Sequence, residues 1–217
     1  MKQPDATSDI DVPFIKNPDD RCVVVVVGMV LARFMPERHF TMAELERLVG
    51  YEKGRGTWKA LSMLNLAKLG FQVYWIEDFD HQQFVHNPKA YLRTILDDKA
   101  YEWQITHGDL EQEVERTRQY MASGLPLEKR QATNDDIKRF LDDGWLVHLE
   151  VNARLLSGKP GYEGHSILVI GYNNKEVIIH NPDGENGNKP SQHVSWELLD
   201  KAWKEFGGSY SLYAFKK

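Results

Sequence analysis

Cys22-Val23-Val24-Val25-Val26-Val27-Gly28-Met29-Val30-Leu31 is the stretch of sequence that decides the fold. Its five consecutive valines favour a strand locally. Against this, residues 29–34 continue the run with helix formers, and Asp19-Asp20 upstream can cap a helix that begins at Arg21 or Cys22. Such a helix is apolar on nearly every face and must be buried at the centre of the domain. We therefore expect a buried central helix headed by Cys22.

Cys22 is the single cysteine of the chain. It cannot form an internal disulfide, which leaves a buried structural thiol, an intermolecular bridge or a reactive nucleophile. At the N-terminus of a helix, the unpaired backbone N–H groups and the helix dipole favour thiolate over thiol, so the cysteine pKa falls from about 8.5. A strand would give the thiol no such help. The helix therefore makes Cys22 a candidate nucleophile, with the buried thiol as the open alternative.

The composition indicates a globular protein of one domain. Of the 217 residues, 41% are hydrophobic and 27% are charged, which is too apolar and too balanced for a disordered chain. The length favours a single domain over residues 1–217, with residues 1–11 as a flexible tail, and it needs neither a metal nor disulfides to hold it together. The net charge of −5 lacks the basic field that phosphate backbones require. Nucleic acid is therefore not an expected partner.

Neither a secretory signal nor a membrane span is expected from the sequence. The first nine residues are polar and acidic, and the most apolar run, residues 22–32, is well short of the roughly 20 residues that span hydrocarbon. The chain also has no Asn-x-Ser/Thr acceptor and no cysteine pair. A cytoplasmic, reducing location without membrane contact is the simplest expectation.

The sequence pattern predicts mainly helices in the first two thirds of the chain and mainly strands after them. Thr41 and Glu44 have the form of a capping box, and Asn173-Asn174 joins two apolar runs as in a hairpin. Because both faces of these hairpin strands are apolar, they should be central in a sheet. The pattern predicts an α+β fold. Helices are expected over 41–50, 57–70, 88–96, 109–121, 133–141 and 195–206, and strands over 71–76, 145–151, 166–171, 177–180 and 210–215.

No motif predicts a cofactor. Gly54-Arg55-Gly56-Thr57 lacks the lysine and the spacing of a phosphate loop. The segment 183–188 lacks the alternation of a calcium loop and is expected to be a surface turn. We therefore expect neither a cofactor nor a metal.

A histidine and an asparagine at strand ends accompany the cysteine. A thiolate nucleophile needs a histidine within hydrogen-bond reach, and the histidine needs a third group that fixes its tautomer. Of eight histidines, His165 follows Gly164 and precedes an apolar strand, while the partner strand ends in His180-Asn181-Pro182. Asn181 should therefore lie beside His165 in the sheet.

Register decides whether His165 and Asn181 share a face. Opposed residues of an antiparallel pair have a constant sum, and 165 plus 181 is even. A two-residue Asn173-Asn174 loop gives an odd sum and places the two side chains on opposite faces. A connection with an odd number of residues, or a bulge, restores the shared face. We predict a three- or five-residue connection.

These motifs, in this order, resemble the papain-like cysteine peptidases, and most closely the bacteriocin-processing, double-glycine leader peptidase-like family. The resemblance rests on Cys22, Gly164-His165 and the segment 180–184, with Gly56-Thr57-Trp58 and Trp203, and spans about residues 12–215. It implies a papain-like fold in which the helix headed by Cys22 packs on a C-terminal antiparallel sheet. It also implies Cys22 as nucleophile, His165 as general base and acid, and Asn181 as the orienting residue.

Three departures from the family pattern leave alternatives open. Asn181 stands where this branch has aspartate, which makes Asp183 an alternative orienting residue. The glutamine that supplies an oxyanion donor is absent, so Asn17 is the candidate. Valines rather than small residues follow the cysteine.

The leading hypothesis is a thiol hydrolase that cleaves a peptide or a small amide through a Cys-His-Asn triad and a thioester. An acyl or aminoacyl transferase on the same fold is the second hypothesis, because an amine can also resolve a thioester. An inactive papain-like binding module is the third, and it predicts a Cys22 sulfur out of reach of His165 and no open cleft.

Overall fold

A mixed sheet forms the centre of the molecule in the computed structural model, which describes residues 8–184, 187–204 and 210–217. Within these residues the strand order is β3-β2-β8-β4-β5-β6-β7, with β1 paired to β5. Neighbouring strands are antiparallel except β2 and β3, which are parallel. The expected α+β class is confirmed. The strands are β1 Ser8–Asp9, β2 Gln72–Ile76, β3 Leu127–Glu128, β4 Leu146–Asn152, β5 Gly164–Tyr172, β6 Glu176–Asn181, β7 Lys189–Ser195 and β8 Leu212–Lys216.

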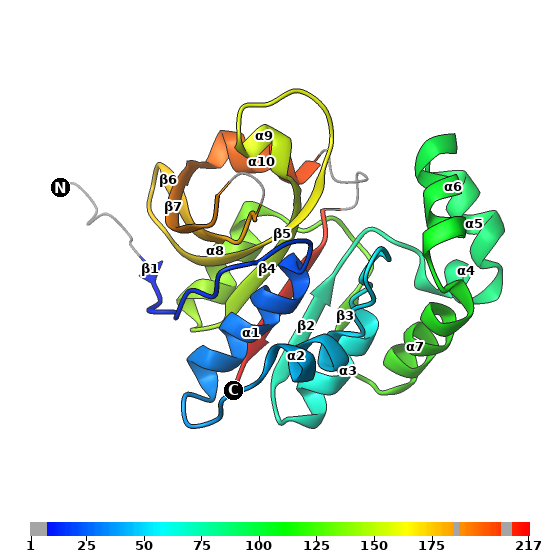
Figure 1. Cartoon of the computed structure of the whole chain (residues 1–217), viewed down its shortest axis with the longest axis horizontal. Helices are drawn as coiled ribbons and strands as arrows, with labels where there is room; N and C mark the ends of the chain where they lie inside the picture. Colours follow the sequence, from blue (N-terminus) through cyan, green and yellow to red (C-terminus); the bar gives the residue numbers. More distant parts are fainter. Residues whose placement is uncertain (1–7, 185–186, 205–209) are drawn as a thin grey trace.

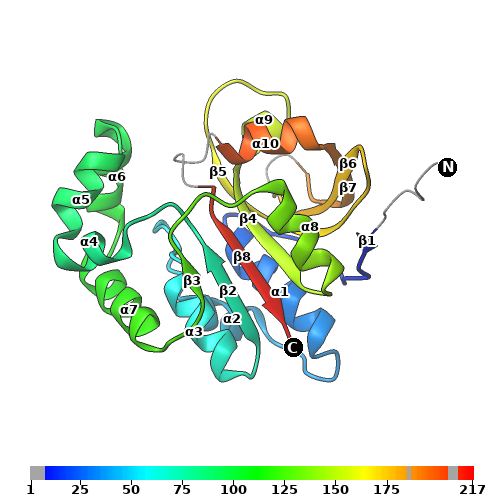
Figure 2. The same ribbon diagram turned by 180° about the vertical axis from the view of Figure 1, so that it is seen from behind.

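Helices cover both faces of the sheet and extend beyond one edge. Helices α1, α2 and α3 lie in front of the sheet in Figure 1, and α8 lies in front of it in the opposite view of Figure 2. Helices α4 to α7 stand together beyond the edge formed by β2 and β3. The helices are α1 Cys22–Phe34, α2 Met42–Val49, α3 Ala60–Lys68, α4 His81–His86, α5 Pro88–Ile95, α6 Asp98–His107, α7 Leu110–Ala122, α8 Asn134–Asp142, α9 Ala153–Leu156 and α10 Trp196–Lys204.

Apolar side chains alternate between the two faces of the central strands. On β8, Tyr213 and Phe215 belong to the core under α1, whereas Leu212 and Ala214 belong to the core under α8 and α10. This alternation follows from the period of two in a strand. β5 is likewise buried from His165 to Tyr172 and lies between β4 and β6. The predicted central position of the β5 strand is confirmed.

The valine run is a helix, as expected. Val24, Val25 and Val26 are completely buried in α1 because the helix is covered by the sheet on one side and by α2 on the other. Gly28 permits the close approach of α2, since a Cβ there would lie only 2.9 Å from Cδ1 of Leu45. Tertiary burial thus overrides the strand propensity of valine.

The start of α1 differs from the prediction. Arg21 is the N-cap residue and makes no side-chain cap, so Asp19 and Asp20 do not cap the helix. Asp20 instead accepts a hydrogen bond from the Tyr51 hydroxyl at 2.5 Å, and Asp19 pairs with Arg21. The Oδ1 atom of Asn17 accepts from the Arg21 N–H at 3.1 Å. A side chain four residues upstream therefore takes over part of the capping.

The hairpin of β5 and β6 has a shorter turn than predicted. Tyr172 pairs with Val177, and the N–H of Asn173 donates to the carbonyl of Glu176 at 2.8 Å. Two residues, 174 and 175, therefore form the loop, and the sum of paired residue numbers is odd. The predicted three- or five-residue connection is wrong.

A bulge at Ile170 corrects the register instead. Val169 pairs with Ile179 while Gly171 pairs with Ile178, so Ile170 is an extra residue on β5. Beyond this bulge the paired numbers have an even sum, and His165 and Asn181 lie on the same face of the sheet. A bulge was the second route to a shared face that the parity argument allowed.

Other departures lie at the ends of the chain. Ser8–Asp9 pair with β5, and the Ile10 N–H donates to the Ile170 carbonyl at 2.8 Å, so the expected tail over 1–11 is wrong for residues 8–10. Three parts of these expectations lie outside the described residues: residues 1–7 of the tail, residues 185–186 of the surface turn, and residues 205–206 of the helix expected over 195–206.

Strand β7 was not predicted. Within the described ranges, no helix has the length and apolarity that crossing a membrane requires.

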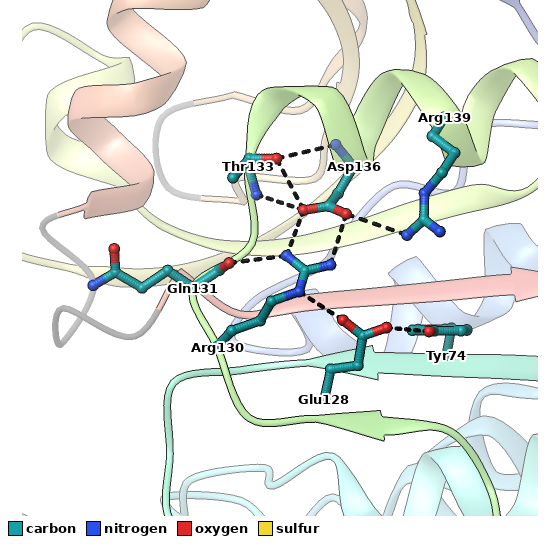
Figure 3. Close-up of polar contacts among 7 residues, drawn as sticks. All are labelled: Tyr74, Glu128, Arg130, Gln131, Thr133, Asp136 and Arg139. Carbon is teal, nitrogen blue, oxygen red and sulfur yellow. Dashed lines mark hydrogen bonds and ion pairs between the residues drawn. The ribbon is translucent and has the colours of Figure 1, made fainter.

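A polar cluster joins β3 to the start of α8 (Figure 3). Arg130 donates to both carboxylate oxygens of Asp136 at 2.7 and 2.8 Å and to Glu128 at 2.6 Å. Asp136 also closes a capping box with Thr133. Burial would raise the pKa of Asp136, but the hydrogen bonds from Arg130 and Thr133 hold it at about 2. The cluster therefore stabilises the fold only while Asp136 is ionised.

Asp136→Asn is expected to lower the free energy of unfolding by about 2 to 3 kcal/mol at pH 7. The folded-state pKa lies below the usual value of about 3.9, so this stabilisation is complete above pH 3.9 and is lost as the pH falls through about 2. The difference in the free energy of unfolding between wild type and variant should fall to about half at pH 3. Urea denaturation at both pH values measures it. Asp135→Asn, at an exposed neighbouring carboxylate, is the matched control, and an equal loss in both variants would contradict the prediction.

Candidate active site

Cys22 is the first residue of α1 and is partly buried at the wall of a cleft of about 1650 Å³. Burial raises the pKa of its thiol. The hydrogen bond to His165 and the charge of His165 lower it more, with smaller contributions from the Ser166 backbone and from the charge of Lys59. The net result is a pKa below the usual value of the thiol. The arrangement favours a thiolate at Cys22.

His165 lies second on β5 and is 8% exposed in the same cleft. Burial alone lowers the pKa of its imidazole, but the hydrogen bond and the charge of Cys22 raise it, followed by Asn181 and Asp183. The net direction is upward. A lowered pKa on the thiol and a raised pKa on the imidazole together favour a thiolate–imidazolium pair.

Asn181 ends β6 and holds the ring of His165. Its Oδ1 lies 2.8 Å from His165 Nε2, and its Nδ2 donates to Oε1 of Gln192 on β7 at 2.9 Å. Because Gln192 accepts from the Asn181 amide nitrogen, the amide oxygen faces the imidazole. His165 Nε2 therefore carries a hydrogen, and Nδ1 is left for the Cys22 thiol.

Asn17 and Asp183 do not take the positions expected of an oxyanion donor and of an orienting residue. Asn17 is 4% exposed, and its Nδ2 donates to the carbonyls of Asp19 at 2.8 Å and Pro182 at 3.0 Å. Both amide hydrogens are thus engaged, and Asn17 does not line the cleft. Asp183 is buried and acts on His165 through its charge, while Asn181 makes the hydrogen bond to the ring.

Asn17 instead ties the two halves of the site together. It joins the loop before Cys22 to Pro182, the residue after Asn181. Gly184 allows this close approach, since a Cβ there would lie 3.0 Å from the Asp19 carbonyl oxygen. The expected oxyanion donor is therefore part of the frame that sets Cys22 against Asn181.

The sequence analysis missed three residues near the site, Gln192, Lys59 and Glu150. Gln192 belongs to the unpredicted strand β7. Lys59 and Glu150 form an ion pair at 2.5 Å in the cleft, and Glu150 also accepts from the Tyr213 hydroxyl at 3.1 Å. Two signals existed for this pair. A lysine at the N-cap of α3 opposes both capping preference and helix dipole, and Glu150 interrupts an apolar strand.

Comparison with known proteins decides the family. The sequence model of the Peptidase_C39 like family matches residues 10–211. The chain belongs to this family. The family assignment agrees with the resemblance to bacteriocin-processing peptidases, and the papain-like fold is confirmed. No curated protein matches the chain.

Three solved structures are similar to this chain, and the first of them supports the fold. A double glycine motif protease from an AMS/PCAT transporter, in complex with its leader peptide, is 11% identical with a TM-score of 0.50 over 96% of this chain and 94% of that one. The peptidase domain of Streptococcus ComA, a bi-functional ABC transporter involved in quorum sensing, is 17% identical with a TM-score of 0.46, covering 97% and 99%. A putative C39-like peptidase from Bacillus anthracis is 18% identical with a TM-score of 0.29, but only 38% of this chain and 46% of that chain are covered.

Proposed function

We propose that this C39-like protein is a cysteine peptidase that hydrolyses a peptide bond through Cys22, His165 and Asn181. The observation that carries the proposal is the meeting of Cys22 and His165 at the wall of one cleft, with the ring of His165 held by Oδ1 of Asn181 at 2.8 Å. At about 1650 Å³ the cleft exceeds the usual volume of roughly 300–1,000 Å³ for small ligands. A peptide is therefore favoured over a small amide.

Acylation begins at the thiolate. The sulfur of Cys22 attacks the carbonyl carbon of the scissile bond, and a C–S bond forms as the carbonyl oxygen becomes an oxyanion. The backbone N–H of Cys22, at the N-terminus of α1, is positioned to donate to that oxygen. When the C–N bond breaks, the imidazolium of His165 gives its proton to the leaving amine. A thioester remains on Cys22.

Hydrolysis of the thioester restores the site. His165, now neutral, takes a proton from water while the water oxygen bonds to the carbonyl carbon. The C–S bond breaks, and the product leaves as a carboxylic acid that ionises. Asn181 holds the ring in one orientation through both steps, and Gln192 holds Asn181.

The alternative of an inactive module made two predictions that differ from the geometry. It requires a Cys22 sulfur out of reach of His165 and no open cleft. The mutual effect of the two side chains on their pKa values, and the cleft that both line, favour a peptidase. An acyl transferase needs the same residues, so only its products distinguish it.

The proposal is tested by incubating the protein with a mixed peptide library in water enriched in ¹⁸O. We expect pairs of new termini, with one ¹⁸O in each new carboxylate, identified by mass spectrometry. The Cys22→Ala protein, run in parallel, should give none. A library left intact by the wild type contradicts the proposal. Ligation of added amines in place of ¹⁸O uptake would assign the protein to acyl transfer instead.

A further inference from the structure

Residues 81–122, which form α4 to α7, build an arm beside the cleft. The arm stands beyond β2 and β3 in both Figure 1 and Figure 2. It packs on the sheet edge through Tyr120 and His81, whose rings contact Trp75. Residues of α5 and α6, and of the link between them, line the cleft that holds Cys22. One wall of the cleft therefore comes from the arm and the other from the sheet and α1.

The large exposed hydrophobic side chains all face this cleft. Among the described residues these are Ile95 at 43%, Trp103 at 43% and Tyr162 at 56% exposure. All three line the cleft. Ile95 and Trp103 belong to the arm, whereas Tyr162 lies in the loop before β5, close to His165. Exposed apolar side chains that gather in one place, rather than scatter, mark a binding surface.

Trp103 connects the arm to the rim of the cleft. Its ring lies so near Gly56 that a Cβ on that residue would be 3.2 Å from two ring atoms. Helix α6 has no buried residue of its own, so Trp103 is not anchored in a core. The indole, stacked on His107 at 5.1 Å between ring centroids, therefore offers exposed aromatic surface to whatever enters.

Charge in the cleft is unbalanced. Of the residues that the structure describes, three lysines and arginines line it, and two of these are paired: Lys59 with Glu150 at 2.5 Å, and Arg55 with Glu52 at 2.9 Å. A concave surface focuses the potential of an excess of one sign and attracts the opposite charge. Among the described residues, six carboxylates line the cleft, those of Asp20, Glu77, Asp97, Glu102, Glu150 and Glu163. Three of them are also paired with a lysine or arginine: Glu150 with Lys59, Glu163 with Arg154 at 3.5 Å and Glu102 with Arg93 at 4.0 Å. The lining carboxylates still outnumber the lining lysines and arginines.

We propose that the cleft selects polypeptide segments that combine basic side chains with large apolar ones. The apolar side chains pack between the arm and Tyr162, and the basic ones face the carboxylates. This inference rests on the proposed function in that the bound segment crosses Cys22. An acidic segment meets an excess of like charge in the cleft and binds less tightly.

The test measures binding apart from cleavage, using the Cys22→Ala protein and fluorescein-labelled peptide pools. All peptides are about 12 residues long, roughly 40 Å when extended. Three pools alternate Leu or Trp with one polar residue, which is Lys in the first pool, Gln in the second and Glu in the third. A fourth pool keeps Lys but has Ser in place of Leu and Trp. In fluorescence anisotropy we expect the Lys pool to bind at least about 10-fold more tightly than the Glu pool, with a smaller ratio at about 500 mM salt than at about 20 mM. The Ser pool should lose at least about 10-fold relative to the Lys pool.

Paired variants assign the effect to the cleft. Glu102→Gln with Glu163→Gln should reduce the preference for Lys over Glu, whereas Glu197→Gln with Asp135→Asn, at exposed carboxylates outside the cleft, should not. Trp103→Ala with Tyr162→Ala should weaken the Lys pool by at least about 10-fold. Equal binding of the Lys and Glu pools, or no binding of any pool, overturns the inference.

Cleavage by the wild type separates this inference from the proposed function. Cleavage without preference for basic, apolar peptides leaves the peptidase proposal standing and overturns the selectivity. Selective binding of the Lys pool without cleavage by the wild type keeps the binding site and overturns the peptidase.

Discussion

Cys22→Ala is expected to lower peptide cleavage by at least about 10⁴-fold without unfolding the protein. Alanine removes the sulfur on which the thioester forms, while α1 stays buried through Val24, Val25 and Val26. The measurement is single-turnover cleavage of whichever peptide the library experiment identifies. Urea denaturation of the same sample checks that the fold is retained.

Cys22→Ser is the matched control for shape. It keeps a hydrogen-bonding group of similar size beside His165 but replaces an easily ionised thiol by a hydroxyl, so we expect it to be nearly as inactive as Cys22→Ala. Cleavage by either variant above about 1% of the wild-type rate would point to a different nucleophile.

His165→Ala is expected to slow alkylation of Cys22 by iodoacetamide about 100-fold at pH 6. In the wild type, the hydrogen bond and charge of His165 keep the thiol pKa below its usual value of about 8.5, so the reactive thiolate persists toward acidic pH. Without His165, burial dominates and raises the pKa. The rate of labelling between about pH 5 and pH 10, read by mass spectrometry, should shift its midpoint upward.

His193→Ala controls for the removal of a histidine as such. His193 is exposed on β7 and pairs with Glu176 away from the cleft, so its loss should leave the labelling profile unchanged. A wild-type midpoint at or above 8.5, or a profile that His165→Ala does not move, would contradict the thiolate–imidazolium pair.

The helix headed by Cys22 was predictable because two properties of the sequence agreed. Helix formers after the valines and the lack of any polar face required burial, and the core under the sheet supplied it. The capping of that helix was not predictable, since Asn17 reaches Arg21 from four residues upstream and is held by Pro182, 165 residues away. Long-range contacts of this kind leave no local pattern.

The candidate site also combines residues that the sequence pattern indicates with residues that only the folded structure brings in. Cys22, His165 and Asn181 stand out as a cysteine at a helix start and polar residues at strand ends. The replacement of the family's aspartate by Asn181 does not disturb the arrangement, because Gln192 turns the amide oxygen of Asn181 toward the ring of His165. Gln192 itself lies on a strand with a polar pattern, which strand propensity does not reveal.

The sequence by itself determined the α+β class and the buried helix, and it pointed to Cys22, His165 and Asn181 as candidate site residues, because hydrophobic period, strand ends and chain order are local properties. Only the tertiary structure decided how they meet. The turn of the hairpin has the wrong parity, and the extra residue Ile170 restores it. The arm that forms one wall of the cleft, and the acidic lining it helps to build, arise from the packing of residues 81–122 against the sheet edge. Packing between distant segments is a property of the folded chain, so no local pattern announces it.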